Sequence, residues 1–274
     1  MPSTPLVSVI IPTWNRRHLL AKALASALSQ RNVSVEVLVC DDGSTDGTAE
    51  MIAGWDDARI HLLSSNNTGR PAIPRNRGIA AAHGEWIAFL DDDDIWLPRK
   101  LENQLSAAQK YSALAVCSNA LRLIPGNKAN IPYLASPPEW LDFKILCRCN
   151  YVITSSAMFH RSLIPKVTGF PEEERYIAVE DYALWLRIAS LSPFIMLQTP
   201  QLIYRDSPAT SIRGRSGSDK KALQSVFFNW CMWAKWRVLS RNGMYANVCV
   251  ASLYFPAITK FFSYLRKLMQ KCSK

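Results

Sequence analysis

Apolar runs and helical patterns alternate along the first part of the chain. Largely apolar runs rich in β-branched residues, each closed by polar or turn-forming residues, predict strands that are buried on both faces. The predicted strands are 6–11, 35–40, 59–65, 85–90 and 113–123. Apolar residues at helical spacing predict helices over 17–30, 72–84, 97–110 and 179–190. A further helix is expected after the turn Asp42-Gly43-Ser44, with Thr45 or Asp46 as its cap.

This alternation predicts βαβ units and a mainly parallel sheet with helices on both faces. In such α/β sheets, ligands bind outside the carboxyl ends of the strands. Three polar segments follow predicted strands directly: Pro12 to Asn15, Asp41-Asp42, and the four consecutive residues Asp91 to Asp94. We therefore expect these segments to share one edge of the sheet.

The pattern is weaker in the second half. Residues 124–150 are rich in Pro, Gly and Asn and are expected to form a loop, and order returns at 151–164. Residues 221–241 predict a helix with an aromatic stripe, which is typical of a helix packed on a core. Residues 257–274 predict a helix with apolar side chains on one face and Lys or Arg on the other.

The four aspartates raise the question of what neutralises them. They stand between the apolar strand 85–90 and the apolar segment 95–97, and no Lys or Arg lies within four positions on either side. An isolated acidic run is usually a solvated surface patch, but its place at the end of a buried strand disfavours that interpretation. Hard oxygen ligands call for Mg²⁺ or Mn²⁺, completed by the phosphates of a substrate.

Other phosphate-binding motifs are absent. The sequence contains no Gly-x-x-x-x-Gly-Lys loop, and no Gly-x-Gly-x-x-Gly follows the first strand, which excludes a P-loop kinase and a Rossmann dehydrogenase. A nucleotidyltransferase usually has a Gly-rich basic loop after its first strand, which is also missing. These observations favour a nucleotide-diphosphate donor whose leaving group is the metal-bound diphosphate.

Four ordered segments together resemble the inverting glycosyltransferases of family 2, which have the GT-A fold. They are "VSVIIPTWNR" (7–16), "VLVCDDGSTDGT" (37–48), "PRNRGIAAAHGEWIAFLDDDDIWLPRKLENQL" (74–105) and "VEDYALWLRIA" (179–189). The resemblance implies a GT-A domain over 1–205, with a nucleotide-sugar-binding half of about 1–112 and an acceptor-binding half of about 113–205. Residues 206–274 would then form a basic loop and a helical extension.

The resemblance also implies roles for individual residues in donor binding. Pro12, Trp14 and Asn15 match the stretch that cups the base and ribose. Asp42, with Asp41 beside it, matches the acid that binds uracil, which favours UDP over GDP or dTDP. Arg75 and Asn76 match a polar pair that faces the nucleotide and its phosphates.

Within the acidic run, Asp91 and Asp93 match the outer acids of an Asp-x-Asp motif. Asp93 is expected to bind Mn²⁺ or Mg²⁺ directly, and Asp91 to bind the ribose or the metal. Asp92 is expected to support the nucleotide sugar and Asp94 to play a supporting part, although an uninterrupted run leaves the register open by one residue.

The resemblance identifies Asp181 as the catalytic base, because inversion needs a carboxylate that deprotonates the acceptor hydroxyl. Glu180 is expected to orient Asp181 or to hold the acceptor. A Glu-Asp pair at a helix start is also a common helix-stabilising feature. Thr154, Ser155 and Ser156 either line the acceptor site or are small polar strand residues.

Charge is distributed unevenly over the 274 residues, whose net charge is +10. Residues 204–274 contain 13 Lys or Arg against two Asp, a net charge of +11, so the basic excess lies in the tail. This argues against a nucleic-acid-binding protein, because the positive charge is not spread over an aromatic groove. It favours attachment of the helix 257–274 to an anionic membrane surface over a soluble helix or a dimer contact.

Compartment and acceptor follow from these features. The first residues lead into a strand and do not form a signal peptide, and seven cysteines without framework spacing fit a reducing compartment. We expect a cytoplasmic enzyme, peripheral on the cytoplasmic face of the bacterial inner membrane, that transfers one sugar to a lipid-linked saccharide in O-antigen, capsule or lipopolysaccharide synthesis. The alternatives are a glycosyltransferase that branches protein glycans and a non-catalytic member that only binds nucleotide sugars.

Overall fold

The computed structural model of the chain describes residues 6–124, 131–206 and 225–234. The chain divides into two compact units, Met1–Val226 and Phe227–Lys274. The first unit extends past its last strand, which ends at Arg205, so the predicted domain boundary at residue 205 stays a prediction. Residues 225–234 are helical, as predicted, whereas the amphipathic segment 257–274 lies outside the described residues. No helix in the described part of the chain is long and apolar enough to cross a membrane.

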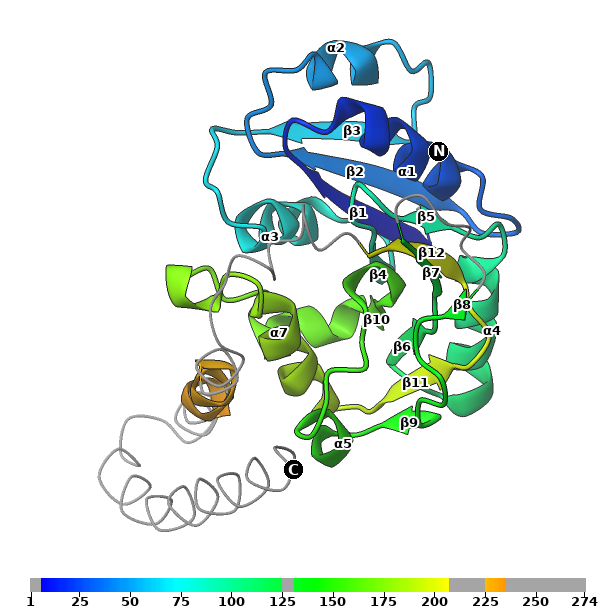
Figure 1. The fold of residues 1–274 in the computed structure, drawn as a ribbon, viewed down its shortest axis with the longest axis vertical. Coiled ribbons are helices and arrows are strands. Elements are labelled where there is room, and N and C mark those ends of the chain that lie inside the picture. Colours follow the sequence, from blue (N-terminus) through cyan, green and yellow to red (C-terminus); the bar gives the residue numbers. More distant parts are fainter. Residues whose placement is uncertain (1–5, 125–130, 207–224, 235–274) are drawn as a thin grey trace. The chain divides into compact units, whose positions relative to one another are not determined.

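The first unit is built around an eight-stranded sheet with the order β3-β2-β1-β4-β10-β6-β11-β9 (Figure 1). β3, β2, β1 and β4 are mutually parallel, β11 is parallel to β6, and β10 is antiparallel to both of its neighbours. The strands are β1 (Val7–Thr13), β2 (Val35–Asp41), β3 (Ile60–Ser64), β4 (Trp86–Phe89), β6 (Ala115–Ser118), β9 (Trp140–Leu141), β10 (Met158–His160) and β11 (Phe194–Leu197). This is the predicted α/β architecture.

A second sheet of four short strands, in the order β5-β12-β7-β8, lies beyond the carboxyl end of β4. Its strands are β5 (Ile95–Trp96), β7 (Leu121–Leu123), β8 (Ile131–Pro132) and β12 (Leu202–Arg205). β12 pairs with β5, which begins directly after the four aspartates, so the end of β12 reaches the acidic run.

The helices cover both faces of the main sheet. They are α1 (Arg17–Leu28), α2 (Thr48–Ala53), α3 (Ala72–Ala81), α4 (Lys100–Tyr111), α5 (Phe143–Leu146), α6 (Ile164–Val167) and α7 (Glu180–Ala189), with single 3₁₀ turns at Thr154–Ser156, Arg161–Leu163 and Glu174–Tyr176. On one face, Val9 and Ile11 of β1 share a buried cluster with Leu20 and Leu24 of α1 and with Leu101 of α4.

The other face of the sheet is covered by α3 and α7. α3 approaches the sheet closely at Gly78, where an added Cβ would lie 2.6 Å from a side-chain carbon of Ile10. Further along, Phe89 of β4 contacts Phe159, Phe170 and Trp185 edge-on or at a tilt. All residues of α7 are buried, which explains why its sequence is more apolar than that of an ordinary surface helix.

Some predicted elements were wrong in detail. The predicted strand 113–123 is two strands in different sheets, because Asn119 leaves the ladder and its side-chain amide pairs with the backbone of Leu134. α4 begins at Lys100 and not at residue 97, so Pro98 precedes the helix. The N-cap of α2 is Gly47 and not Thr45 or Asp46, and the Asp46 carboxylate accepts the Thr48 hydroxyl of α2 and the backbone N–H of Arg17 at the start of α1. The expected loop 124–150 contains β8, β9 and α5.

Candidate active site

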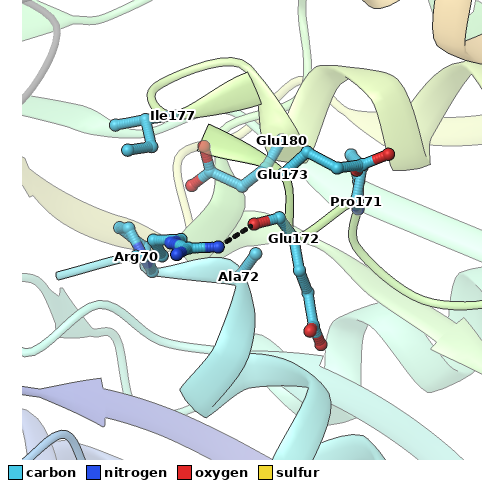
Figure 2. Close-up of a pocket in the computed structure, with 8 residues that line it drawn as sticks. Arg70, Ala72, Pro171, Glu172, Glu173, Ile177 and Glu180 are labelled. Carbon is cyan, nitrogen blue, oxygen red and sulfur yellow. Dashed lines mark hydrogen bonds between the residues drawn. The ribbon is translucent and has the colours of Figure 1, made fainter. Parts of the chain in front are cut away.

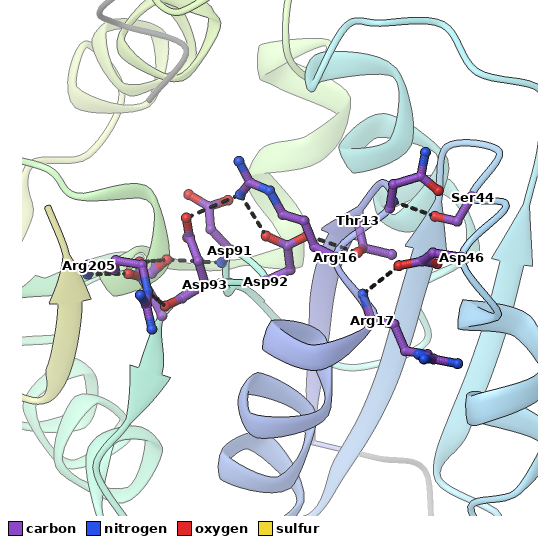
Figure 3. Close-up of polar contacts among 12 residues, drawn as sticks. Thr13, Arg16, Arg17, Ser44, Asp46, Asp91, Asp92, Asp93 and Arg205 are labelled. Atoms are coloured by element: carbon purple, nitrogen blue, oxygen red, sulfur yellow. Dashed lines mark hydrogen bonds and ion pairs between the residues drawn. The ribbon is translucent and has the colours of Figure 1, made fainter. Parts of the chain in front are cut away.

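The acidic run lies where the sheet order reverses, between the carboxyl ends of β1 and β4. β1 has β2 on one side and β4 on the other, and this kind of switch point opens a crevice for ligands. Across it, the Thr13 hydroxyl at the end of β1 donates to Asp92 at 2.8 Å. Figure 3 shows the run with the side chains that reach it from α1 and β12.

Two of the four aspartates point inward and are held by the fold. Asp92 is buried and accepts hydrogen bonds from Thr13 and from Arg16 Nη1. Asp94 is also buried, and its two oxygens accept the Ser155 hydroxyl at 2.5 Å and the backbone N–H of Arg205 at 2.8 Å. Asp94 therefore ties the turn after β4 to the 3₁₀ turn Thr154–Ser156 and to the end of β12.

The other two aspartates face outward. The side chains of Asp91 and Asp93 are 30% and 22% exposed, whereas that of Asp92 is 6% exposed. Asp93 pairs with Arg16 Nη1 at 3.1 Å, and Asp91 pairs with Arg75 Nη2 at 2.7 Å. Only the outward pair can accept a ligand without giving up a bond that holds the turn.

The electrostatic state of the run reflects its burial. Burial raises the pKa of Asp92 to about 7, although Arg16 opposes the shift. Burial and the neighbouring charge of Asp91 also raise the pKa of Asp93, and burial raises that of Asp94 well above its usual range. Like-charged carboxylates in a low-dielectric site disfavour one another's ionised form, so this site has a deficit of positive charge.

The predicted base-binding residues lie at the neighbouring strand ends. Trp14 is 52% exposed just beyond β1, and Asn15 adopts a left-handed conformation with a φ of 51°. The Asn15 side chain accepts the backbone N–H of Thr45, which joins the segment after β1 to the segment after β2. The polar segments after β1, β2 and β4 are thus brought to one edge, as predicted.

Asp41 and Asp42 are both buried and are used locally. The Asp41 carboxylate accepts the backbone N–H of Ser44. The Asp42 carboxylate accepts the backbone N–H groups of Thr68 and Gly69 at 3.0 and 3.2 Å, and the Thr68 hydroxyl. Asp42 therefore orders the segment after β3, and contact of either acid with a base remains a prediction.

Arg75 joins the acidic run to the predicted catalytic helix. This α3 residue is only 7% exposed and donates from Nη2 to Asp91 and from Nη1 to Glu180, at 2.7 and 2.8 Å. Glu180 and Asp181 are the first two residues of α7, where the helix dipole favours negative charge. The Thr154 hydroxyl donates to Asp181 at 3.0 Å, which places Thr154 beside the predicted base.

Asn76 lies in a different environment from its neighbour Arg75. Its amide donates to the backbone carbonyl of Phe170 and to Glu172, and its oxygen accepts the backbone N–H of Phe170. In this structure Asn76 holds the segment before α7, and its predicted role toward the phosphates stays a prediction.

A narrow crevice lies beside Glu180, between the start of α3 and the segment 171–177 (Figure 2). The Arg70 guanidinium donates to the backbone carbonyl of Glu172 across it. Glu180 contributes to its lining, and the Glu180 Oε2 atom is buried without a hydrogen-bond partner among the residues described. Burial is the largest cause of a raised pKa at Glu180, and the charge of Asp181 adds to it against the effect of Arg75.

The residues present fit a divalent cation in chemistry. Asp91 and Asp93 offer partly exposed carboxylate oxygens, which are hard ligands. They lie at a site where the carboxylates outnumber the arginines that contact them. In the described part of the chain, no group of three or more His, Cys, Asp or Glu is arranged as a preformed metal site. This agrees with Mg²⁺-type sites, which use one or two carboxylates and take further ligands from water and substrate phosphates.

Sequence reasoning missed two arginines and underestimated two hydroxyl residues. Arg16 and Arg205 contact the acidic run, the latter also by a long Nε bond to the Asp93 carbonyl at 3.4 Å, and Thr13 and Ser155 anchor its inward members. Arg16 is the last residue of the quoted segment "VSVIIPTWNR", so its place after a strand end was a usable signal. Arg205 lies more than a hundred residues away, and nothing local announces its contact.

The fold and the site together define an α/β protein with an acidic cluster at a topological switch point, whose outward carboxylates are of the kind that bind divalent cations. Comparisons with known proteins agree. Over 185 residues the chain is 35% identical to the Escherichia coli protein described as UDP-Glc:alpha-D-GlcNAc-diphosphoundecaprenol beta-1,3-glucosyltransferase WfaP, covering 68% of this chain and 70% of that protein.

Two solved structures share the fold. Staphylococcus aureus TarS in complex with UDP-GlcNAc superposes with a TM-score of 0.69 at 18% identity, covering 83% of this chain and 66% of that one. The mannosyltransferase PcManGT from Pyrobaculum calidifontis, in complex with GDP-Man and Mn²⁺, gives a TM-score of 0.57 at 19% identity, covering 98% of this chain and 87% of that one.

Residues 8–167 match the family described as Glycosyl transferase family 2. This match covers more than half of the chain, and together with the identity to WfaP it shows that the chain belongs to glycosyl transferase family 2. The predicted family, fold and enzyme class are thereby confirmed.

Proposed function

We propose that the protein is a metal-dependent, inverting glycosyltransferase that moves one hexose or N-acetylhexosamine from a UDP-sugar to a hydroxyl of a lipid-linked saccharide. The observation that supports this proposal is the Arg75 bridge, because one guanidinium contacts both the outward Asp91 and Glu180, the residue directly before Asp181. In a single displacement, the residues that bind the donor and the catalytic base must both be positioned around the anomeric carbon.

Asp93 and Asp91 would hold Mn²⁺ or Mg²⁺ together with the donor diphosphate. When bound, the cation neutralises the negative charge that develops on the departing nucleoside diphosphate. Asp92 and Asp94 support the turn without contacting the cation, because their oxygens are already used by Thr13, Arg16, Ser155 and Arg205. This assignment selects the register that the sequence left open.

Asp181 acts as the general base in this proposal. Its carboxylate, oriented by the Thr154 hydroxyl, accepts the proton of the acceptor hydroxyl as that oxygen attacks the anomeric carbon. The nucleoside diphosphate departs from the opposite face, so an α-linked donor gives a β-linked product. Glu180 borders the adjacent crevice and supports the acceptor side.

The lipid-linked acceptor is inferred from a relative. The name of WfaP states a UDP-Glc donor and a diphosphoundecaprenol-linked GlcNAc acceptor. The basic tail of this chain, with its net charge of +11 over residues 204–274, suits attachment to the anionic cytoplasmic leaflet where such an acceptor is displayed. Nearly all of that tail lies outside the described residues.

The test is a donor panel followed by an acceptor panel. The full-length protein is incubated with Mn²⁺ or Mg²⁺ and with UDP-, GDP- and dTDP-sugars, and release of the nucleoside diphosphate is measured. The preferred donor is then offered with synthetic lipid-diphosphate saccharides. Transfer from a UDP-sugar to such an acceptor is expected, and activity that is equal with and without EDTA would overturn the metal-dependent mechanism.

Asp181→Asn provides the matching test of the base. The substitution keeps the shape of the side chain but removes the proton acceptor, so kcat should fall at least about a hundredfold while UDP affinity stays nearly unchanged. Steady-state kinetics and calorimetric titration with UDP measure the two quantities. An undiminished kcat would remove Asp181 from the mechanism.

A further inference from the structure

Arg75 is the most deeply buried arginine at the active site, and its charge is fully committed to protein carboxylates. Nη2 donates to Asp91 and Nη1 to Glu180, while Nε is buried without an acceptor among the described residues. The Phe170 ring lies below the guanidinium, 5.5 Å from its central carbon to the ring centroid. The Arg75 side chain is only 8% exposed, and each of its Nη atoms donates to a protein carboxylate.

The Arg75 bridge joins two parts of the chain whose relative position matters for the reaction, the acidic run and the start of α7. Asp91 follows β4, the strand that leads into the predicted metal ligands, whereas Glu180 begins α7 and immediately precedes Asp181. The two carboxylates come from different segments of the chain, and one planar guanidinium fixes both with charge-assisted bonds. A lysine could not replace this geometry, because its single ammonium group cannot span both positions in the same way.

Charge balance requires the same residue. Glu180 and Asp181 are consecutive buried acids, and Asp91 is the next carboxylate along the bridge. Without Arg75, Asp91 and Glu180 would each lose the ion pair that the structure shows. Removing one member of a buried ion pair is costly, because the remaining charge is left uncompensated.

We propose that Arg75 is a positioning residue for transfer: it holds Glu180, and through it the start of α7 with Asp181, at a fixed place relative to the donor-binding aspartates. This inference rests on the proposed function and deepens it, since it assigns Arg75 to the alignment of base and donor. It replaces the expectation that Arg75 contacts the nucleotide or its phosphates.

The test compares Arg75→Met, Glu180→Gln and the double variant, with UDP affinity and kcat measured separately. Arg75→Met should lower kcat at saturating donor by about a hundredfold, while the UDP dissociation constant with Mn²⁺ changes by less than about threefold. Because Glu180→Gln removes the charge that Arg75 compensates, the double variant should be at least about tenfold more active than the product of the two single effects predicts.

Two controls separate positioning from general destabilisation. Arg77→Met removes another α3 arginine, which donates to the Ser65 hydroxyl and the Asp41 backbone carbonyl and to no carboxylate, so its effect should be additive with Glu180→Gln. Arg75→Lys keeps the charge but not the fork, and should recover only part of the lost kcat. If Arg75→Met does not fold, the same cycle is measured with Arg75→Lys.

The outcomes discriminate cleanly. A tenfold or larger loss of UDP affinity with kcat preserved would make Arg75 a donor ligand and overturn the inference. Strict additivity with Glu180→Gln would also overturn it. Neither result affects the proposed function, which fails instead if the wild-type protein neither binds UDP nor turns over any nucleotide sugar.

Discussion

Buried acids at the two ends of the main sheet have pKa values shifted in opposite directions. At the amino end, Glu36 of β2 accepts hydrogen bonds from the Ser8 hydroxyl and from the backbone N–H groups of His83 and Gly84, with no second acid among its hydrogen-bonding partners. Burial alone would raise the pKa of Glu36, but these hydrogen bonds outweigh it and the net shift is downward. A carboxylate with several neutral donors is stable as an anion.

At the carboxyl end, four acids are crowded together and the arginines do not fully compensate them. Burial raises the pKa of Asp92, Asp93 and Asp94, in contrast to Glu36. The amino end therefore satisfies its acid internally and fastens the turn before β4. At the carboxyl end, negative charge exceeds positive charge, and a bound cation would compensate the excess. Such an arrangement is expected of a ligand-binding site and not of a purely structural contact.

The largest expected effect breaks the carboxyl end. Asp93→Asn removes the outward carboxylate proposed to hold the metal, and kcat/KM should fall about a thousandfold, or ~4 kcal/mol of transition-state stabilisation. Stability in the absence of metal should stay the same or rise slightly, because one of several mutually repelling charges is gone. Kinetics at saturating Mn²⁺ and thermal unfolding with EDTA measure both, and a parallel loss of activity and stability would contradict the assignment.

Glu36→Gln tests the amino end and should show the reverse pattern. The free energy of unfolding should drop by about 2 kcal/mol because the amide replaces one acceptor oxygen with a donor facing other donors. The kcat of the folded protein should remain unchanged, since Glu36 lies at the far end of the sheet from the site. Glu50→Gln, an exposed substitution in α2, is the matched control and should change stability very little.

The pH dependence of this difference has a definite sign. The pKa of Glu36 is lower in the folded protein than the ordinary value of about 4.3 in the unfolded chain. Its contribution is therefore complete above about pH 5 and is lost as pH falls through the folded pKa. Urea unfolding at several pH values should show a constant gap between wild type and Glu36→Gln at pH 6 to 8 that narrows below about pH 4.

The contrast between the two ends also shows what the sequence could reveal. The apolar runs ending at Ile11, Cys40 and Leu90 predicted that three polar segments would meet at one edge, and they do. The inward or outward direction of each aspartate depends on the turn after β4, in which the Asp94 N–H bonds the Asp91 carbonyl, and on partners as distant as Ser155 and Arg205. Local pattern contains no information about such long-range contacts.

The break in the predicted strand 113–123 has the same cause. Most of its residues are apolar, but Asn119 is fixed by backbone groups of Leu134, and the chain leaves one sheet for another. Arg75 is the corresponding case in the site. Its identity suggested a phosphate ligand, and only the buried geometry of α3 and α7 shows that both of its Nη atoms are taken by carboxylates.

The smallest expected effect concerns Lys100 of α4. Its buried amine has neither a hydrogen-bond partner nor an ion-pair partner among the described residues. Its Nζ has no hydrogen-bond partner among the described residues and lies 3.8 Å from the centroid of the Trp96 ring. Burial lowers its pKa well below the usual range. Lys100→Met keeps the length and removes the buried polar group, so the free energy of unfolding should rise by about 1 kcal/mol. Lys110→Met, exposed on the same helix, is the control and should have no such effect.

The sign of the pH effect follows from linkage. The unfolded chain keeps the Lys100 proton up to about pH 10.4, whereas the folded protein releases it earlier, so wild-type stability rises with pH between the two pKa values. The advantage of Lys100→Met should therefore be larger at pH 6 than at pH 9 in urea unfolding. If the variant is less stable at both values, the contact with Trp96 is worth more than the desolvation of the amine, and Lys100 stabilises the fold as a cation over an aromatic ring.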